Sequence, residues 1–326
     1  MLRDLFDNPW VLMPTKAVVI IALVLTCFLV VAYMEHKVMA HMQARVGPME
    51  AGRFHGVLQI VADGIKFVQK ESITPRAADK WVFALAPAVT LIPVMLVYGF
   101  LPYSSHLVPI RSDVGLFVTL ALSSVSVIGV LMAAWSSANK YSLMGGIRAA
   151  AQLIAYELPL VLAAAAVAMQ AGSADLAVIV QRQDRLLNAL LPWLAVALVV
   201  LFVAALAELT RPPFDMPVAD SELVFGHLTE YTGLRFAFFL LAEFAGVVSM
   251  SAIAATLFLG GYRGYVLPDG PWWLALKSFL LAFVVIWVRA TYPRMREDQL
   301  QAFAWTRLVP VSFLVILVTG FVKVGV

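Results

Sequence analysis

The chain has 326 residues, of which 62% are hydrophobic and 13% charged, and its mean hydropathy is +0.89. A water-soluble domain carries about 25% charged residues, so most of this surface must face lipid rather than water. The formal net charge of +3 is small and dispersed, which excludes the basic footprint of a nucleic-acid-binding protein.

The single cysteine, Cys27, lies inside an apolar run. It has no partner within the chain for a disulfide, and an iron–sulfur cluster usually needs about four protein ligands, mostly cysteines. We therefore expect no cluster on this chain. The N-terminus lacks a basic stretch followed by a short apolar core and a small-residue cleavage site. We expect its first apolar run to be a retained helix rather than a cleaved signal.

Eight apolar segments approach the roughly 20 residues that a helix needs to cross a bilayer. They predict an all-α polytopic membrane protein with one transmembrane domain over residues 1–326. Prolines inside the spans are tolerable where neighbouring helices or waters satisfy the freed carbonyls. In chain order the segments are Ala17–Met34, Trp81–Tyr103, Val114–Trp135, Ala149–Ala171, Ala189–Ala207, Leu234–Leu259, Trp272–Arg289 and Trp305–Val322.

The distribution of basic residues predicts the orientation of these helices. With eight spans, both termini lie on one side of the membrane, and the loops after the odd-numbered spans lie on the other. Those loops, about residues 35–80, 136–148, 208–233 and 290–304, hold 15 of the 23 lysines and arginines, counting the adjoining helix ends. Because positively charged loops stay in the cytoplasm, we expect these four loops to be cytoplasmic and both termini to be periplasmic.

The first cytoplasmic loop contains a segment with helical periodicity, Phe54–Lys70. Its polar residues Gln59, Asp63, Lys66 and Lys70 recur at spacings of four, three and four, and apolar residues occupy the opposite face. This pattern is typical of an amphipathic helix that lies in the membrane interface, here beside a lipid-facing opening. The alternative is a solvated connector helix docked on the protein itself.

Three acidic residues, Glu157, Glu208 and Glu243, lie within or at the ends of apolar spans. A charged side chain at the bilayer centre costs at least ~2.5–3.5 kcal/mol, and removal from water favours the protonated form of a carboxyl. Glu157 and Glu243 both lie roughly 12–14 Å from the cytoplasmic edge, judged from the helical rise, so they could form one buried polar site. We expect the three carboxyls to handle protons. The alternative is that each hydrogen-bonds a neighbouring helix and holds the bundle together.

The third cytoplasmic loop is acidic and rich in proline. It contains Asp215, Asp220, Glu222 and Glu230, and its prolines at positions 212, 213 and 217 rule out a continuous helix. A flexible loop would gain little from three prolines, so we expect this loop to be packed and rigid. Its acids either continue a proton path upward from the membrane or cap helices through Asp220 and Glu222.

No motif points to a metal or a dinucleotide. The chain has neither the glycine fingerprint for dinucleotides nor a phosphate-binding loop, so redox cofactors would belong to other chains. The five histidines show no metal-ligand spacing with Cys, Asp or Glu, and we expect no metal site among them: His36, His41, His55, His106 and His227.

Several sequence blocks follow one another along almost the whole chain. They are Glu35-His-Lys, Gln43-Ala-Arg45-Val-Gly47-Pro48, Leu58-Gln-Ile-Val-Ala-Asp63-Gly64-Ile-Lys66, Lys70-Glu71, Trp135–Arg148, Tyr156-Glu157, Glu208–Tyr231, Ala242-Glu243-Phe244, Trp287–Arg294 and Asp298-Gln299-Leu300. Blocks of this length in this order resemble the quinone-site membrane subunits of respiratory complex I, the NADH:quinone oxidoreductase, lettered H in bacteria.

The resemblance implies an eight-helix subunit in the bacterial cytoplasmic (inner) membrane, with periplasmic termini. Such a subunit forms most of the tunnel for its substrate, a quinone (ubiquinone or menaquinone), and couples quinone reduction to proton translocation without being catalytic alone. FMN, NADH and iron–sulfur clusters would bind to partner subunits. Those partners would be the other membrane-arm subunits and the soluble quinone-site and iron–sulfur subunits.

By matching positions, the resemblance also implies roles for individual residues. The proton path would contain Glu157, Glu208, Glu243, Asp215, Asp220, Glu222, Glu230 and Asp63. The quinone tunnel or its charged walls would contain Glu35, Arg45, Gln59, Lys66, Arg211, Arg289 and Arg294.

The chain departs from the family's usual residues at five positions, His36, Met49, Ile60, Val218 and Asp220. The last two changes remove one loop carboxylate and shorten another, so the details of the proton path and the electron donor stay open. Two other functions remain as alternatives. One is the homologous membrane subunit of a hydrogenase-type or other-donor ion-pumping complex. The other is an independent cation-coupled transporter that would use the buried glutamates as ligands.

Overall fold

The computed structural model describes residues 9–52, 54–183, 188–218, 220–264 and 268–324, and every regular element within them is a helix. This confirms the predicted all-α class. The long helices are α2 (Pro9–Met42), α4 (Lys80–Phe100), α5 (Gly115–Ser136), α6 (Lys140–Ala171), α8 (Pro192–Glu208), α10 (Gly233–Phe258), α11 (Pro271–Thr291) and α13 (Val309–Val324), which continues α12 (Glu297–Phe303) through the π-helical η3 (Ala304–Leu308). The short ones are α3 (Gln59–Gln69), α7 (Leu176–Arg182), α9 (Asp220–Leu223), η1 (Asn188–Leu190) and η2 (Gly226–Leu228).

Seven helices of the described chain are long and apolar enough to cross a membrane: α2, α4, α5, α6, α10, α11 and the continuous helix from α12 to α13. The remaining predicted span, Ala189–Ala207, corresponds to α8, which has 17 residues and follows the 3₁₀ turn η1. At the usual helical rise, α8 is roughly 26 Å long, slightly less than the ~30 Å of a typical hydrocarbon core. The protein is therefore a multi-pass membrane protein.

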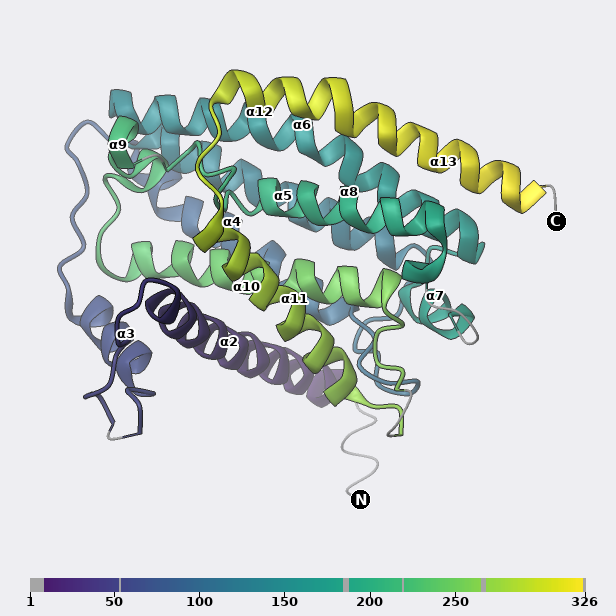
Figure 1. Cartoon of the computed structure of the whole chain (residues 1–326). Helices are drawn as coiled ribbons and strands as arrows, with labels where there is room; N and C mark the ends of the chain where they lie inside the picture. The colour runs from purple at the N-terminus through teal and green to yellow at the C-terminus, as the bar shows by residue number, and fades with distance from the viewer. Residues whose placement is uncertain (1–8, 53, 184–187, 219, 265–267, 325–326) are drawn as a thin grey trace.

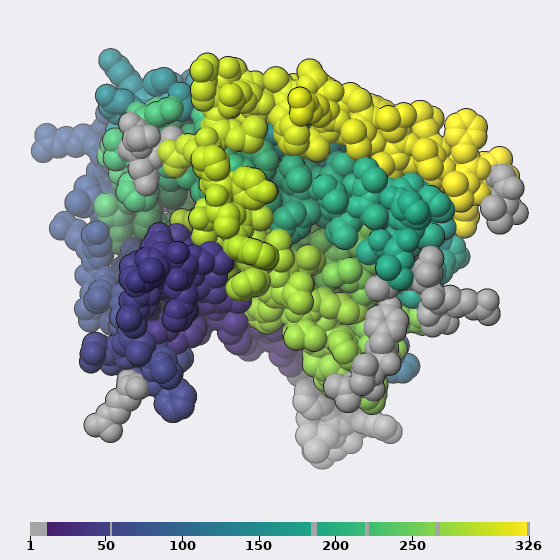
Figure 2. Space-filling view, in the orientation of Figure 1, coloured from purple at the N-terminus to yellow at the C-terminus, as the bar shows by residue number. Residues whose placement is uncertain are grey.

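The long helices pack side by side into one bundle (Figure 1). In this bundle α10 packs against α2, α4 and α11, while α6 packs against α5, α8 and α13. The segment Ala245–Phe258 of α10 is buried throughout, so α10 forms the centre, whereas α13 runs along the outside (Figure 2). The short helices α3 and α9 lie at one end of the bundle. The end of α13 and α7 lie toward the other end of the bundle (Figure 1).

Three helices extend beyond the predicted spans, because hydropathy marks the part of a helix that crosses lipid and not the point where the helix ends. α2 continues to Met42, so Glu35 is helical instead of lying in a loop. α6 begins at Lys140, where the Asn139 side chain accepts a hydrogen bond from a backbone N–H of the first turn. Most of the predicted loop 136–148 is therefore helix. Likewise, α12 begins at Glu297, inside the predicted loop 290–304.

The predicted amphipathic helix begins five residues later than expected, at Gln59 instead of Phe54. Before it, His55 and Gly56 have positive φ angles of 52° and 74°, which form a turn and not a helix. A Cβ at Gly56 would lie 2.3 Å from the carbonyl oxygen of Pro48, so only glycine fits there. The apolar face of α3 is exposed, at Val61, Ile65 and Val68. This exposure favours the membrane-interface interpretation over docking of that face on the chain itself.

A proline in α4 helps to anchor the loop between α8 and α10. Pro87 cannot donate to the carbonyl of Phe83, which leaves that oxygen without its usual helical donor. The hydroxyl of Tyr231, in the loop, donates to this oxygen at 3.1 Å. The two rings also stack, with centroids 4.0 Å apart. The carbonyl oxygen that Pro87 leaves free is thus hydrogen-bonded by the loop between α8 and α10.

Candidate functional site

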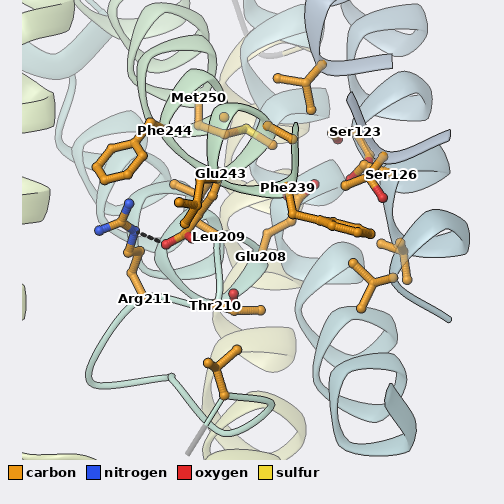
Figure 3. A pocket seen from close by; sticks show the side chains of 18 of the residues that line it. Ser123, Ser126, Glu208, Leu209, Thr210, Arg211, Phe239, Glu243, Phe244 and Met250 are labelled. Atoms are coloured by element: carbon orange, nitrogen blue, oxygen red, sulfur yellow. Dashed lines mark hydrogen bonds and ion pairs between the residues drawn. The ribbon is translucent and has the colours of Figure 1, made fainter. Parts of the chain in front are cut away.

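A cavity of about 410 Å³ lies between α4, α5, α8 and α10 and the loop of residues 209–232, and its wall includes residues at the ends of α2 and α11. Figure 3 shows side chains from α10 and from this loop meeting within it. Most of the loop is packed against the bundle, with Phe214, Met216, Leu223 and Leu228 all buried. The prediction of a packed loop is therefore confirmed.

Arg211 lies three residues beyond the end of α8 and connects two of the long helices. Thr210, just before it, has a φ of +49°, and the Arg211 side chain lines the cavity. The Arg211 side chain is 2% exposed. Its Nη1 donates to Glu35 Oε2 of α2 at 2.6 Å, and its Nε lies 2.9 Å from Glu243 Oε1 of α10 (Figure 3). The guanidinium also lies 4.8 Å from the centroid of the Phe244 ring, a cation–π contact.

Two further arginines complete a charge-balanced group. Arg289 of α11 donates to the second oxygen of Glu35, and Arg294 Nη2 lies 2.9 Å from Asp215 Oδ2. Three guanidinium groups thus face three carboxylates. Burial lowers the pKa of Arg211, but the two carboxylates beside it outweigh burial and hold that pKa above its ordinary value. Burial raises the pKa of Asp215 to about 6, although Arg294 opposes this shift.

Away from these ion pairs, a large part of the cavity wall is apolar. It is formed by side chains of α4 and α10, among them Val94, Val97, Leu240, Phe244, Met250 and Ile253. The cavity therefore has a charged part, rich in guanidinium donors, and an apolar part. An elongated molecule with a polar head and an apolar tail would match this arrangement.

Glu208 is the last residue of α8, and its side chain lines the cavity. Its Oε2 atom has no hydrogen-bond partner among the described residues. The Ser123 hydroxyl and the Glu157 carboxylate are close enough to act on it electrostatically. Ser124 in turn donates a hydrogen bond to Glu157. Ser123 and Ser124 are neighbours on α5, and they thus lie beside Glu208 of α8 and Glu157 of α6, respectively.

The structure does not unite Glu157 with Glu243 in one site, as their matched depth had suggested. Glu243 lines the cavity and is paired with Arg211, whereas Glu157 does not line the cavity and has Glu208 as its acidic neighbour. Helical rise gives depth but not direction around the helix axis. The basic partner of Glu243 is Arg211, which comes from the loop that precedes α10 and not from α10 itself.

Two other acids of the loop, Glu222 and Glu230, do not line the cavity. Arg148 of α6 donates to Glu222 at 2.5 Å and also lies 3.2 Å from Glu297 of α12. The hydrogen bond and charge of Arg148 lower the pKa of Glu222. Glu230 accepts a hydrogen bond of 2.6 Å from the asparagine that precedes α6. Asp220 belongs to α9, but its side chain lies outside the described residues.

Apart from Glu35, the residues predicted from the first loop also lie away from the cavity. On α3, Gln59 Nε2 donates to Asp63 Oδ1 at 3.0 Å, and Lys66 Nζ lies 3.5 Å from the same oxygen. Arg45 is exposed and donates to Gln43 at 2.8 Å. The structure therefore gathers six of the predicted residues at the cavity wall: Glu35, Glu208, Arg211, Asp215, Glu243 and Arg289.

Several polar residues of the cavity were not predicted. Thr90, Ser126 and Ser249 line it, as does His227 of η2, which is 7% exposed and whose Nδ1 has no hydrogen-bond partner among the described residues. The run Ser123-Ser-Val-Ser126 inside an apolar span was a visible signal. His227 offered none, because a search for metal-ligand spacing does not find an isolated cavity histidine. Within the described residues, no group of three or more His, Cys, Asp or Glu side chains is arranged to hold a metal ion.

The sequence matches a known family over nearly its whole length. The family model described as NADH dehydrogenase matches residues 15–320. Among NADH-quinone oxidoreductase subunits lettered H, that of Dehalococcoides mccartyi is 43% identical over 315 residues, covering 96% of this chain and 87% of the relative. The corresponding protein of Geobacillus thermodenitrificans is 44% identical over 298 residues, 89% of this chain and 87% of that protein. The one lettered H 1 in Geobacter sulfurreducens is 38% identical over 346 residues, 98% of each chain.

Proposed function

This chain belongs to the NADH dehydrogenase family, and we propose that it is the quinone-tunnel-forming membrane subunit of a proton-pumping NADH:quinone oxidoreductase. The relatives described above carry the name of the H-lettered component of that enzyme complex. Like them, this chain is a subunit of an enzyme and not an enzyme by itself. Its partners would be the other membrane-arm subunits and the soluble quinone-site and iron–sulfur subunits.

The observation that carries the proposal is the division of the cavity into a charged and an apolar part. A quinone has two carbonyl oxygens on its headgroup and an isoprenoid tail. The guanidinium groups of Arg211 and Arg289 are suitable donors to such oxygens, and the apolar wall of α4 and α10 suits the tail. Ubiquinone and menaquinone share these features, so the proposal covers the class of quinones and not one member.

The electrons would come from other subunits. The chain has a single cysteine, and iron–sulfur clusters usually need about four protein ligands. We therefore assign the clusters, FMN and the NADH site to the soluble partners. This chain would hold the quinone near the last electron donor, and the quinone would take up two electrons and two protons to become a quinol.

Proton coupling would use the carboxyls at and near the cavity. Asp215 is suited to proton exchange, because its pKa of about 6 lies close to neutral pH. Glu208 and Glu157 form a neighbouring acidic pair inside the bundle. A change of charge on the bound headgroup would alter the balance of the three arginine–carboxylate pairs. That change is a physical link between quinone reduction and proton movement.

The surroundings of the cavity suggest how the quinone arrives and how the subunit sits in the membrane. The exposed apolar face of α3 would lie in the membrane interface beside the opening. The basic residues near the loops at the α3 end support a cytoplasmic position for that end. Both termini would then be periplasmic, in the bacterial inner membrane.

Filling the cavity tests this proposal. Gly246 lines it, and a Cβ there would meet only the end of the flexible Leu209 side chain, at 3.0 Å. In the assembled complex, Gly246→Val should slow quinone reduction while reduction of a hydrophilic acceptor by the upstream clusters stays intact. The matched control is Gly320→Val on α13, where a Cβ would make an ordinary 3.6 Å contact with Met169. Equal quinone kinetics in the two variants would refute the proposed tunnel.

A further inference from the structure

Three side chains that line the cavity each carry a buried polar atom with no hydrogen-bond partner among the described residues. These atoms are Glu208 Oε2, Arg211 Nη2 and His227 Nδ1. Buried polar groups in proteins are nearly always hydrogen-bonded, either to protein or to ordered water. Three such atoms at the wall of one cavity therefore indicate that the cavity is hydrated.

The size and lining of the cavity agree with this. Its volume of about 410 Å³ is far above the ~30 Å³ that one water occupies in the liquid. The hydroxyls of Thr90, Ser123 and Ser249 each donate to a carbonyl of their own helix. Their oxygen lone pairs remain able to accept hydrogen bonds from water. The cavity is thus both roomy and polar enough to order several waters.

His227 is held firmly at the wall of this cavity. It belongs to η2, which packs against α5 and α6, and its ring makes an edge-on contact with Phe239, with centroids 5.9 Å apart. Burial lowers the pKa of His227 to about 4, so the imidazole is neutral near pH 7. A neutral imidazole offers one N–H donor and one acceptor nitrogen. It can therefore either donate a hydrogen bond to a water or accept one from it.

We propose that ordered water in this cavity bridges Glu208 Oε2 and His227 Nδ1, and that His227 is a positioning residue for proton exchange at Glu208. The proton passes between the Glu208 carboxyl and the adjacent water, and no other covalent bond forms or breaks. The water bridge stands independently of the proposed function, whereas its role in proton transfer rests on that function.

The other charged groups at the cavity wall do not compete for this role. Glu35 and Glu243 are occupied by Arg211 and Arg289, and Asp215 is occupied by Arg294. Beyond the wall, Glu157 accepts from Ser124. Glu208 is thus the cavity carboxylate whose Oε2 still needs a donor, and His227 is the neutral titratable group beside the same space.

The test is infrared difference spectroscopy of the assembled complex in lipid, combined with turnover. The carboxyl band of Glu208 is identified by its loss in Glu208→Gln. His227→Phe keeps the ring against Phe239 but removes both nitrogens, so the band should move to higher frequency, as it does when a carboxyl loses a hydrogen bond. Coupled turnover should fall about tenfold, less than the ~10²–10⁴-fold typical for loss of a proton-transferring group itself. His227→Asn, which restores a polar atom near Nδ1, should recover both, and the exposed His106→Phe should change neither.

The outcomes separate the water bridge from the proposed function. An unchanged Glu208 band in His227→Phe overturns the bridge, whatever the turnover. A shifted band with wild-type turnover overturns the positioning role. Failure of the proposed function would appear instead as quinone kinetics that ignore Gly246→Val. If His227→Phe does not assemble, the wild-type complex still tests the water bridge. Titration of Glu208 should then change a water O–H band. This band should shift in ¹⁸O-labelled water and should be lost in Glu208→Gln. Absence of that band overturns the proposal.

Discussion

Replacing Arg211 by methionine removes the group that joins α2 to α10 while keeping much of its apolar volume. In the native protein its guanidinium lies 2.6 Å from Glu35 and 2.9 Å from Glu243, and the Arg211 side chain is 2% exposed. After the substitution, Glu35 keeps its contact with Arg289. Glu243 loses Arg211, its ion-pair partner in the described structure. The variant thus leaves a carboxylate at the cavity wall without compensation.

The expected cost follows from burial. Removing one partner of a buried ion pair typically destabilises a protein by ~3–5 kcal/mol. Glu243 is 34% exposed, so water screens part of its charge and we expect the lower end, about 3 kcal/mol. Combining Arg211→Met with Glu243→Gln removes the unpaired charge and should recover ~0.5–3 kcal/mol, the usual coupling between contacting residues.

The assay compares the fraction of assembled complex that survives heating in these variants and in Arg148→Met. Arg148 is also paired with two carboxylates, at 2.5 and 3.2 Å, but Glu222 and Glu297 are 51% and 42% exposed. Loss of such exposed pairs should cost only ~0–1 kcal/mol. If Arg211→Met survives heating as well as Arg148→Met does, or if the double variant recovers nothing, the reasoning from buried ion pairs is refuted.

Three further predictions concern proton binding and packing. The pKa of Asp215 in the folded state is about 6, above the ordinary 3.8, so the folded state binds this proton more tightly than the unfolded state does. The thermal stability of the complex should therefore fall as pH rises from about 4 to about 6. Asp215→Asn should abolish this fall, and an unchanged pH profile in the variant would contradict the assignment. Gly226→Ala should prevent assembly, because Gly226 has φ of +53° and a Cβ would lie 1.8 Å from a carbonyl oxygen, whereas Gly64→Ala, with nothing within 4 Å, should assemble normally on a native gel. Glu157→Gln keeps the side-chain shape but cannot titrate, so in proteoliposomes it should depress proton translocation per assembled enzyme, while exposed Glu50→Gln should not; wild-type pumping in both would show that Glu157 only links helices.

The sequence was sufficient to predict which segments form long apolar helices, because hydropathy reports their composition directly. It was not sufficient to predict where the helices end. The polar segments Glu35–Met42 and Lys140–Arg148 are helical although their composition is that of loops. Their helical state depends on continuity with apolar spans and on the cap at Asn139, and hydropathy contains no term for either.

Six residues of the cavity wall were predicted from the sequence, but their pairings were not. Glu35 contacts Arg211 and Arg289, which lie 176 and 254 residues further along the chain. Family resemblance named all three, yet no property of one sequence says which carboxylate meets which arginine. Depth along the helices gave the wrong partner for Glu157, because direction around the axis depends on packing. His227 was missed because its importance comes from lining a cavity that only the fold creates.

The most direct test of the central claim is to locate a quinone in the assembled complex. A photoreactive quinone analogue is bound in lipid, activated, and its sites of attachment on this chain are mapped by mass spectrometry. The account predicts attachment within residues 209–215 and 236–253, at the cavity wall, and loss of that attachment in Gly246→Val but not in Gly320→Val. Attachment confined to the outer face of α13, or unchanged by Gly246→Val, would contradict the claim that this cavity receives the quinone.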